Sequence, residues 1–413
     1  MARLSVGLCV LSGVLGGRAM GGEEASLLQS VPRTPVERLM QACTVGKLEA
    51  CELLGRHYML GEGVPKDERR AAELFEKVCA GGAVAGCFTL GLLHQEGLGV
   101  PKDVHRAGAL YERACEGGVG MACVALASLY VKGLGDFQDL RRAAVLHEKA
   151  CKGGVAESCR FLEKKAGEVA LFKKDCEDGK AQACFELGLL YTLGLGEVGL
   201  GAPQADSRAA ALYERACKGG VAKGCLEAGG FYEDGRGVGM DGRHAAALYE
   251  QACEGGEAWG CYKLGDLHEQ GGAVSSDVKR AAALYEKACK GGETVGCFSL
   301  GILLEEGRGV RKDERRAAAL YEKTCKETET VGCYRLGFLY REGRGVRKDE
   351  RRAAALFEKV CAGEKRVGCY ELGSLYEEGR GVRKDERRAA ELYEKACDRG
   401  DVRACSAIRE RFE

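Results

Sequence analysis

The residues with the greatest chemical capacity in this sequence are its cysteines, which number 23 among 413 residues. Apart from Cys9, they form pairs in which seven residues separate the two thiols. Paired thiols can form a disulfide, bind a metal ion as thiolates, or act as a redox-active dithiol. The pairs are Cys43 and Cys51, Cys79 and Cys87, Cys115 and Cys123, Cys151 and Cys159, Cys176 and Cys184, Cys217 and Cys225, Cys253 and Cys261, Cys289 and Cys297, Cys325 and Cys333, Cys361 and Cys369, and Cys397 and Cys405.

The spacing within each pair favours disulfides. Structural zinc sites use cysteines two to four residues apart, often with histidine, and catalytic dithiols use the shorter C-x-x-C pattern. Residues eight apart on one straight helix lie about 12 Å from each other, whereas a disulfide needs Cα atoms within about 7 Å. We therefore predict a chain turn inside each pair, supplied by glycines such as Gly81 and Gly82. The segment 326–329 after Cys325 holds no glycine, which predicts a differently shaped turn there. We predict no metal and no cofactor.

The pairs recur every 36 residues over most of the chain, which is typical of a solenoid of helical repeats. Between Cys289 and Cys325, apolar residues at helical spacing predict one helix over 293–306 and a second that ends at Cys325. A glycine loop at 307–310 separates them, and Asp313 is the predicted N-cap of the second helix. We call the first helix of each hairpin helix A and the second helix B. Each disulfide then joins the end of one helix B to the start of the next helix A.

A glycine recurs in the middle of helix A, four residues after the second cysteine of the pair. Glycine inside a helix costs about 1 kcal/mol relative to alanine, so its recurrence predicts a close approach between the two helices of a hairpin. These glycines are Gly91, Gly188, Gly265, Gly301, Gly337 and Gly373.

Two irregularities interrupt the array. Only sixteen residues separate Cys159 from Cys176, against 27 in a regular repeat, which predicts fused or shortened helices and a change of superhelix direction. The next loop, 194–206, is longer than the others. We therefore predict an N-terminal array over 34–166 and a C-terminal array over 167–413.

The N-terminus has the features of a secretory signal peptide over 1–21, followed by a short linker over 22–33. Arg3 supplies the charged start, and the apolar run over 4–17 is too short to span a bilayer. Cleavage would also remove Cys9 and leave only paired cysteines, which favours a secreted or periplasmic protein. The alternatives are an ordinary N-terminal segment, and residence in the mitochondrial intermembrane space, which would need import without a cleaved signal.

The repeat pattern carries a family resemblance. The pattern Cys-aromatic-x-Leu-Gly-x-Leu-Tyr-x-x-Gly-x-Gly-Val-x-x-Asp-x-x-x-Ala-x-x-Leu-Tyr-x-x-Ala-Cys, over about residues 35–410, resembles the Sel-one-like repeat (SLR) family, relatives of the tetratricopeptide repeats. The paired cysteines resemble those of the secreted bacterial cysteine-rich Hcp proteins, and a mitochondrial cytochrome oxidase assembly factor is similar in plan. The resemblance implies an all-α fold, a right-handed α/α superhelical solenoid of about ten helical hairpins with one disulfide per repeat. It also implies an adaptor role, and some Hcp proteins are described as penicillin-binding proteins or slow β-lactamases.

Few residues outside the cysteines suggest catalysis. Ser276 and Lys279 spell the S-x-x-K motif of serine β-lactamases, but the companion motifs are missing and Asp277 between them is a predicted N-cap. His94 and His268 take helix A positions that usually hold tyrosine or leucine, which is typical of a packing role. We predict a non-enzymatic protein- or peptide-binding scaffold. The alternative, a weak penicillin-binding protein or β-lactamase, rests on the resemblance alone.

The predicted binding surface is the groove lined by helix A, by analogy with tetratricopeptide repeats. Residues one and five positions after the second cysteine share a face directed away from the cysteine–leucine face. The first position, as in Phe88 and Phe298, is expected to pack against the neighbouring hairpin. The fifth position varies in type, as a ligand-reading surface would. The fifth-position residues assigned to the groove are Leu92, Leu189, Asp266, Ile302, Phe338 and Ser374.

The charge of the chain is balanced, with 62 basic and 62 acidic residues. No excess of positive charge favours nucleic acid or an anionic membrane surface. We expect a protein or peptide ligand in the helix A groove, no nucleic acid partner, no membrane span, and a monomeric chain.

Overall fold

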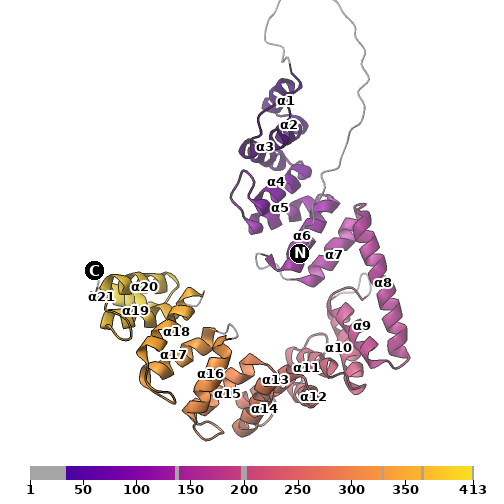
Figure 1. Ribbon diagram of the computed structural model, residues 1–413. Helices are drawn as coiled ribbons and strands as arrows, with labels where there is room; N and C mark the ends of the chain where they lie inside the picture. Colours follow the sequence, from indigo (N-terminus) through magenta and orange to yellow (C-terminus); the bar gives the residue numbers. More distant parts are fainter. Residues whose placement is uncertain (1–33, 135–138, 197–201, 327–329, 364–366, 412–413) are drawn as a thin grey trace, which may run out of the picture. The chain divides into compact units, whose positions relative to one another are not determined.

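The computed structural model describes residues 34–134, 139–196, 202–326, 330–363 and 367–411, which form α-helices and no β-strand (Figure 1). The predicted signal peptide and linker, 1–33, lie outside the described residues. The helices are α1 (Pro35–Thr44), α2 (Leu48–Leu60), α3 (Glu68–Ala80), α4 (Val84–Glu96), α5 (Val104–Glu116), α6 (Gly120–Lys132), α7 (Leu140–Lys152), α8 (Ala156–Glu177), α9 (Ala181–Thr192), α10 (Ala202–Lys218), α11 (Ala222–Asp234), α12 (Gly242–Glu254), α13 (Ala258–Gln270), α14 (Val278–Lys290), α15 (Thr294–Glu306), α16 (Glu314–Lys326), α17 (Thr330–Glu342), α18 (Glu350–Ala362), α19 (Val367–Glu378), α20 (Glu386–Asp398) and α21 (Val402–Arg411).

The described residues up to Val119 form one compact unit, and those from Gly120 onward form a second. Inside each unit every helix packs against the next one along the chain, which is the property that defines a solenoid. The first unit holds α1 and the hairpins α2/α3 and α4/α5. The second holds α6/α7, the single helix α8, and six hairpins from α9/α10 to α19/α20, closed by α21. The predicted all-α solenoid is confirmed. The predicted array boundary after residue 166 lies within α8 and stays a prediction.

The local capping chemistry follows the sequence. Helix A of the repeat analysed above begins one residue inside the predicted range, at Thr294, and ends at Glu306 as predicted. The Asp313 carboxylate accepts the backbone N–H of Arg316 at 2.9 Å, which confirms it as the N-cap of α16. Asp277 caps α14 in the same way, through the backbone N–H of Arg280. These caps start helix B at a constant distance from the glycine loop, so each hairpin keeps the same register.

The core of each hairpin is an aromatic ring of helix B seated on the mid-helix glycine of helix A. Tyr321 of α16 is fully buried, and a Cβ on Gly301 would lie 2.6 Å from its ring. The predicted close approach is therefore confirmed, because a methyl group would collide with the ring. The equivalent pairs are Gly55 with Phe75, Gly91 with Tyr111, Gly188 with Tyr213, Gly229 with Tyr249, Gly265 with Tyr285, Gly337 with Phe357, and Gly373 with Tyr393. The hairpin α6/α7 instead has Ala127 opposite the smaller ring of His147 at the corresponding positions.

The tyrosine hydroxyl of this core finds an acceptor on helix A, four residues after the glycine. Tyr321 donates to the Glu305 carboxylate at 2.8 Å, and burial together with this bond raises the pKa of the tyrosine. Where helix B carries phenylalanine, the helix A residue four positions after the glycine has no hydroxyl to bind. This residue is Met59 in the hairpin of Phe75 and Arg341 in the hairpin of Phe357. The type of ring on helix B and the type of residue at this helix A position therefore vary together from repeat to repeat.

Disulfides close the joints between consecutive hairpins. In the ten pairs whose geometry the structure describes, the Cα atoms lie 4.5–4.8 Å apart, and each bond joins the last turn of one helix to the first turn of the next. Cys115 and Cys123 are also disulfide-bonded cysteines. The ten bonds join Cys43 with Cys51, Cys79 with Cys87, Cys151 with Cys159, Cys176 with Cys184, Cys217 with Cys225, Cys253 with Cys261, Cys289 with Cys297, Cys325 with Cys333, Cys361 with Cys369, and Cys397 with Cys405.

These bonds join the cysteines that the sequence spacing pairs. The second cysteine of each pair stands in the first turn of its helix and is buried in most repeats, as at Cys51, Cys87, Cys184, Cys225 and Cys369. Cys159 of α8 and Cys405 of α21 are only half-buried. The enclosed turn uses a glycine of positive φ, such as Gly82 at +92°. The predicted irregular turn after Cys325 falls on 327–329, outside the described residues.

Further contacts hold both ends of helix B against the next repeat. At the disulfide end, Lys323 donates from Nζ to the carbonyl of Cys289 at 3.0 Å, and Lys359 donates to that of Cys325 at 2.6 Å. At the loop end, the second glycine of the next A–B loop lies so close that a Cβ on Gly345 would collide with the backbone of Glu314. Successive hairpins are thus fastened at two separate points, which limits hinge motion between them.

The shortened repeat is a fused helix, as predicted. α8 runs without interruption for 22 residues, and only Ser158 and Cys176 are buried among its side chains. The hairpins on either side of α8 still meet at their loop ends, where Arg141 of α7 forms an ion pair with Asp206 and donates to the Thr192 carbonyl at 2.6 Å. The extra residues of the 194–206 segment do not all form loop. Helix α10 begins at Ala202 and absorbs the last of them, which corrects the prediction of a loop reaching residue 206.

Two adjacent glycines of α11 test the ring-on-glycine core. A Cβ on Gly229 would lie 2.5 Å from the Tyr249 ring, whereas a Cβ on Gly230 would meet only the Tyr249 hydroxyl, at 3.8 Å. We expect Gly229→Ala to lower the free energy of unfolding by about 1–3 kcal/mol through overpacking. Gly230→Ala should leave it unchanged or raise it by up to about 1 kcal/mol, because alanine favours the helix. Urea unfolding followed by circular dichroism measures both, and equal effects of the two substitutions would contradict the packing account.

A second prediction concerns the joints. Replacing Cys289 and Cys297 together by alanine removes the link between α14 and α15 and should lower stability by about 2–3 kcal/mol, the loop-entropy value for a disulfide that closes so short a loop. The matched pair, Cys397 and Cys405, joins only the terminal helix α21 and should cost less global stability when removed. Urea unfolding under oxidising conditions compares the two variants. No difference from the unaltered protein in the first variant would show that the turn alone holds the joint.

Candidate binding surface

The six predicted groove residues come from six different helices, one in each hairpin concerned. Leu92 of α4 lies in the first unit and is 37% exposed; Leu189 of α9 lies in the second and is 38% exposed. Ile302, Phe338, Asp266 and Ser374, all in the second unit, are half-buried. Each side chain therefore reaches the surface of its own helix A. In the second unit these helices follow one another along the solenoid, as α9, α13, α15, α17 and α19 (Figure 1).

The first-position rings form the base of this face. Phe298 packs on Tyr321 with ring centroids 5.7 Å apart, and Tyr334 packs on Phe357 at 6.0 Å. These ring contacts are with helix B of the same hairpin, and the packing against the neighbouring hairpin that the sequence predicts stays a prediction. They complete the core around the glycine and are themselves half-buried. The fifth position, one turn further along helix A, is left as the position that can meet a partner.

The two polar groove residues are tied to their own helices. Asp266 accepts a hydrogen bond from Gln270 Nε2 at 2.8 Å, and Ser374 donates to Glu378 at 3.0 Å. Both bonds join residues four apart, so they hold the polar groups along the helix surface. Asp266 also lies close enough to Tyr262 to raise the pKa of that tyrosine, although burial is the larger cause.

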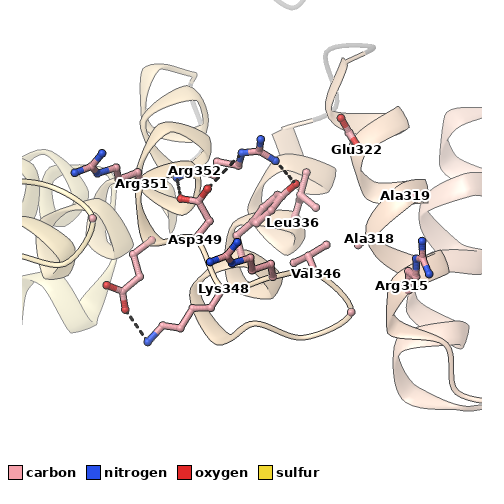
Figure 2. A pocket seen from close by; sticks show the side chains of 15 residues that line it. Arg315, Ala318, Ala319, Glu322, Leu336, Val346, Lys348, Asp349, Arg351 and Arg352 are labelled. Carbon is pink, nitrogen blue, oxygen red and sulfur yellow. Dashed lines mark hydrogen bonds and ion pairs between the residues drawn. The ribbon is translucent and has the colours of Figure 1, made fainter.

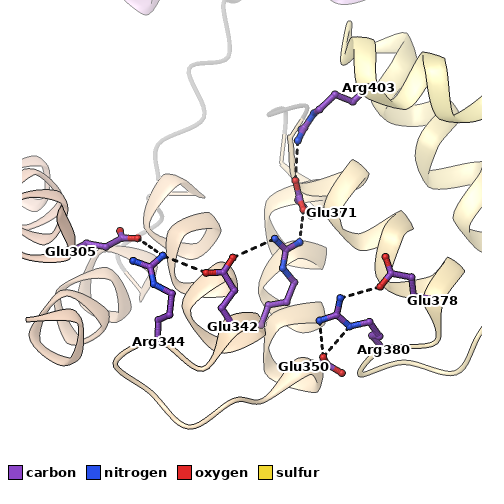
Figure 3. Close-up of polar contacts among 9 residues, drawn as sticks. Glu305, Glu342, Arg344, Glu350, Glu371, Glu378, Arg380 and Arg403 are labelled. Atoms are coloured by element: carbon purple, nitrogen blue, oxygen red, sulfur yellow. Dashed lines mark hydrogen bonds and ion pairs between the residues drawn. The ribbon is translucent and has the colours of Figure 1, made fainter.

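Ion pairs connect neighbouring helices A at the edge of this face (Figure 3). The Glu371 carboxylate of α19 binds Arg341 of α17 at 2.7 Å and Arg403 of α21 at 3.1 Å, while its own side chain is only 6% exposed. Arg341 also stacks on the Phe338 ring, 4.3 Å from its centroid. One repeat earlier, Glu305 meets Arg344 at 3.3 Å. Charges on this side of the solenoid are therefore neutralised by partners from the next repeat.

One exposed aromatic residue was not predicted from the sequence. Trp259 of α13, the only tryptophan of the chain, is 37% exposed and packs on Tyr262 with centroids 4.9 Å apart. It stands two residues before Cys261, where the following two repeats carry Val295 and Val331. The signal available in the sequence was a large aromatic residue at a position that holds no other aromatic residue in any repeat.

Of the residues considered for catalysis, the two histidines of helix A are engaged in structural contacts. Ser276 lies in the loop before α14, and no hydrogen bond joins it to Lys279 among the residues that the structure describes. His94 and His268 are buried, and each places Nδ1 3.3 Å from a backbone oxygen of the following loop. This shared contact agrees with the packing role inferred from the sequence.

A serine–histidine contact that the sequence analysis did not find lies between α7 and α8. The Nδ1 atom of His147 is 3.1 Å from the Oγ atom of Ser158. Ser158 is only 1% exposed, and burial lowers the pKa of His147. A substrate cannot reach this serine, so the pair serves packing between the two helices. Within the described residues no group of three or more His, Cys, Asp or Glu side chains could hold a metal ion, and no helix is long and apolar enough to cross a membrane.

The repeated sequence of the hairpins matches a known family. The model of the Sel1 repeat matches nine stretches that together cover most of the chain: 48–82, 84–119, 120–155, 181–221, 222–257, 260–293, 294–328, 330–363 and 367–401. This chain belongs to the Sel1 repeat family. The longest gap between consecutive matches, 156–180, contains the fused helix α8.

Several solved Sel1 repeat structures are similar to this chain. A protective antigen of uropathogenic Escherichia coli with an SLR fold is 24% identical over 92% of this chain and 90% of that one, with a TM-score of 0.41. A Sel1 repeat protein from Oxalobacter formigenes is 22% identical over 55% and 88%, at 0.48. The cysteine-rich protein B of Helicobacter pylori is 35% identical over 33% of this chain and 98% of its own, at 0.27. No curated protein matches this Sel1 repeat chain.

The Glu371 cluster leads to a prediction about the integrity of this face. Glu371→Gln keeps the shape of the side chain but leaves Arg341 and Arg403 without their shared carboxylate, so we expect a loss of about 1–3 kcal/mol in unfolding free energy. Glu378→Gln is the matched control, because Glu378 pairs with Arg380 at an exposed site, and should cost less than about 1 kcal/mol. Thermal and urea unfolding compare the two. An equal cost would show that burial of Glu371 adds nothing to its ion pairs.

Proposed function

We propose that this Sel1 repeat protein is a non-enzymatic scaffold of an extracytoplasmic compartment that binds a protein or peptide along the helix A face of its second unit. The observation that carries the proposal is the recurrence of one surface position, the fifth after the second cysteine, on a frame fastened at every described joint by a disulfide. A rigid frame that repeats one position with different side chains suits the recognition of an extended ligand.

The disulfides support the compartment. Bonds of this number persist in secreted and periplasmic proteins, whereas cytosolic thiols are kept reduced. The cysteines of these bonds are almost fully buried in most repeats, for example Cys297 and Cys333 at 0% exposure. Their burial against the hairpin cores fits a structural role, because redox-active cysteines need access to a partner thiol.

The character of the face suggests the ligand. The exposed Trp259 packs on the half-buried Tyr262 at one helix A, and Ile302 and Phe338 offer half-buried apolar surface at the next two. Asp266 adds a polar position beside the aromatic pair. Aromatic residues that are partly exposed and already packed on a neighbour lose little conformational entropy on binding. We therefore propose a peptide segment with apolar side chains at intervals as the ligand, and a monomeric chain as its receptor. No observation favours a second function.

Selection from a library of linear peptides displayed on phage, with the oxidised full chain as bait, tests this function. Quenching or enhancement of the single tryptophan then reports binding of each selected peptide in solution. Ile302→Lys combined with Ser374→Lys should weaken binding by about tenfold, since both place an ammonium group on the helix A face. Ala247→Lys combined with Ala355→Lys is the matched control on exposed positions of helix B, and should leave affinity unchanged.

The comparison of the two variants distinguishes binding at the helix A face from non-specific binding to the chain. Selected peptides that bind both variants as well as the unaltered protein would place the ligand elsewhere. Failure to select any peptide against the oxidised chain would count against peptide binding altogether. Circular dichroism of all variants checks that the fold is kept. We expect it to be kept, because the substituted residues are half-buried or exposed.

A further inference from the structure

Two clefts of the same construction lie between consecutive helices B of the second unit. One, of about 1080 Å³, lies between α16 and α18 and is drawn in Figure 2. The other, of about 740 Å³, lies between α14 and α16. In the first cleft the half-buried Val346 of the loop before α18 supplies aliphatic surface, while Ala318 of α16 and Leu336 of α17 form its buried floor. These clefts are on the helix B side of the hairpins and are separate from the helix A face.

Part of the charge around the first cleft is neutralised locally. The ammonium group of Lys348 pairs with Glu350 at 3.0 Å, and Arg352 pairs with the N-cap Asp349 at 3.4 Å. These groups compensate one another inside the loop and the first turn of α18. The remaining acidic side chain of the lining, Glu322, pairs with Lys326 of its own helix at 3.2 Å.

Three arginines that line the first cleft have no carboxylate partner of this kind. Arg315, Arg347 and Arg351 are exposed, and among the described residues their guanidinium groups make no ion pair and no hydrogen bond. Figure 2 shows Arg315 on one side of the cleft and Arg351 on α18 at the other. The cleft between α14 and α16 repeats the arrangement with Lys279 and Arg311, which also have no partner in the described part of the chain.

Other arginines of the same repeats do have carboxylate partners. Arg344 and Arg380, which stand between the two glycines of their loops, each donate through Nε and a terminal nitrogen to a glutamate of the preceding repeat, at 2.8–3.0 Å. Arg316 reaches Glu286 of the preceding helix B at 2.7 Å. The repeats therefore supply carboxylates where an arginine fastens one hairpin to the next, and supply none for the arginines of the clefts.

We infer that the helix B clefts bind an acidic protein segment in which apolar side chains alternate with aspartate or glutamate. The planar guanidinium groups of Arg315, Arg347 and Arg351 match carboxylates in geometry and charge. The apolar surface between them takes the intervening side chains. The loops at 307–316, 343–352 and 379–388 are identical in sequence, so one long acidic segment can engage successive clefts.

The same features favour a protein segment over nucleic acid. A strand of nucleic acid is held by stacking on exposed aromatic rings as well as by phosphate contacts. The aromatic residue of the first cleft is Tyr340, and the guanidinium group of Arg352 already lies over its ring, 5.5 Å from the centroid. The apolar lining instead consists of aliphatic side chains, which suit leucine or isoleucine of a peptide.

Fluorescence anisotropy of a labelled synthetic peptide, with leucines separated by pairs of glutamates, tests the inference on the oxidised full chain. Charge reversal of Arg315, Arg347 and Arg351 to glutamate should weaken binding by about tenfold or more. The matched control reverses Lys152, Lys164 and Lys174, exposed cations on α7 and α8 outside both clefts, and changes the net charge equally. The affinity of this control should stay within about twofold of that of the unaltered chain, a change that includes the small general effect of net charge.

Three results would overturn the inference. An equal loss in the two triple variants would show a general charge effect. Unchanged binding of a peptide whose leucines are replaced by serine would show that the apolar lining is not used. Displacement of the peptide by single-stranded DNA or polyphosphate at lower concentration than by unlabelled peptide would assign the clefts to phosphate polymers. Because the substitutions that test the helix A face do not touch these clefts, the two proposals fail separately.

Discussion

Close contact between an aromatic ring and a glycine backbone determines the spacing of the helices in these hairpins, and the repeat surfaces follow from that spacing. The ring of Tyr321 lies where a Cβ on Gly301 would be, and the same contact recurs in hairpin after hairpin. Burying a ring of this size stabilises the hairpin by more than the mid-helix glycine costs, about 2 kcal/mol against about 1. With the helices this close, the Tyr321 hydroxyl reaches Glu305, and the first-position ring of Phe298 completes the core.

The joints between hairpins use the ends of helix B, because its middle is already committed to the core. One end carries the disulfide and a lysine directed at the cysteine carbonyl, as in Lys323 and Cys289. The other end receives the glycine loop of the next repeat, where Arg344 and Glu314 form a two-pronged ion pair. Fastening at both ends leaves little freedom between repeats. The fused helix α8 departs from this plan, since it has no loop of its own and most of its side chains are exposed.

This division of contacts leaves two different surfaces in the second unit. On the helix A side, charges such as Glu371 are buried and shared between repeats, so the fifth positions stand as largely uncharged sites between them. On the helix B side, the residues that line the clefts include more arginines than carboxylates, so the clefts carry an excess of positive charge. A chain with balanced total charge can therefore present a neutral face and a basic one.

The sequence by itself determined the hairpin and the joint. The 36-residue period, the capping aspartates and the recurring glycine are local signals, and a seven-residue gap closes as a disulfide only across a turn. It also indicated the fused helix, because eleven missing residues remove a loop but keep the helical phase. Only the tertiary structure decided which arginines have partners, that Phe298 packs within its own hairpin, that α10 absorbs residues 202–206, and that Trp259 is exposed. The ion pairs depend on residues 30 positions apart meeting across a joint, and the ring contacts depend on two helices meeting within a hairpin. A local pattern carries the type and spacing of such residues, but not the distance between them.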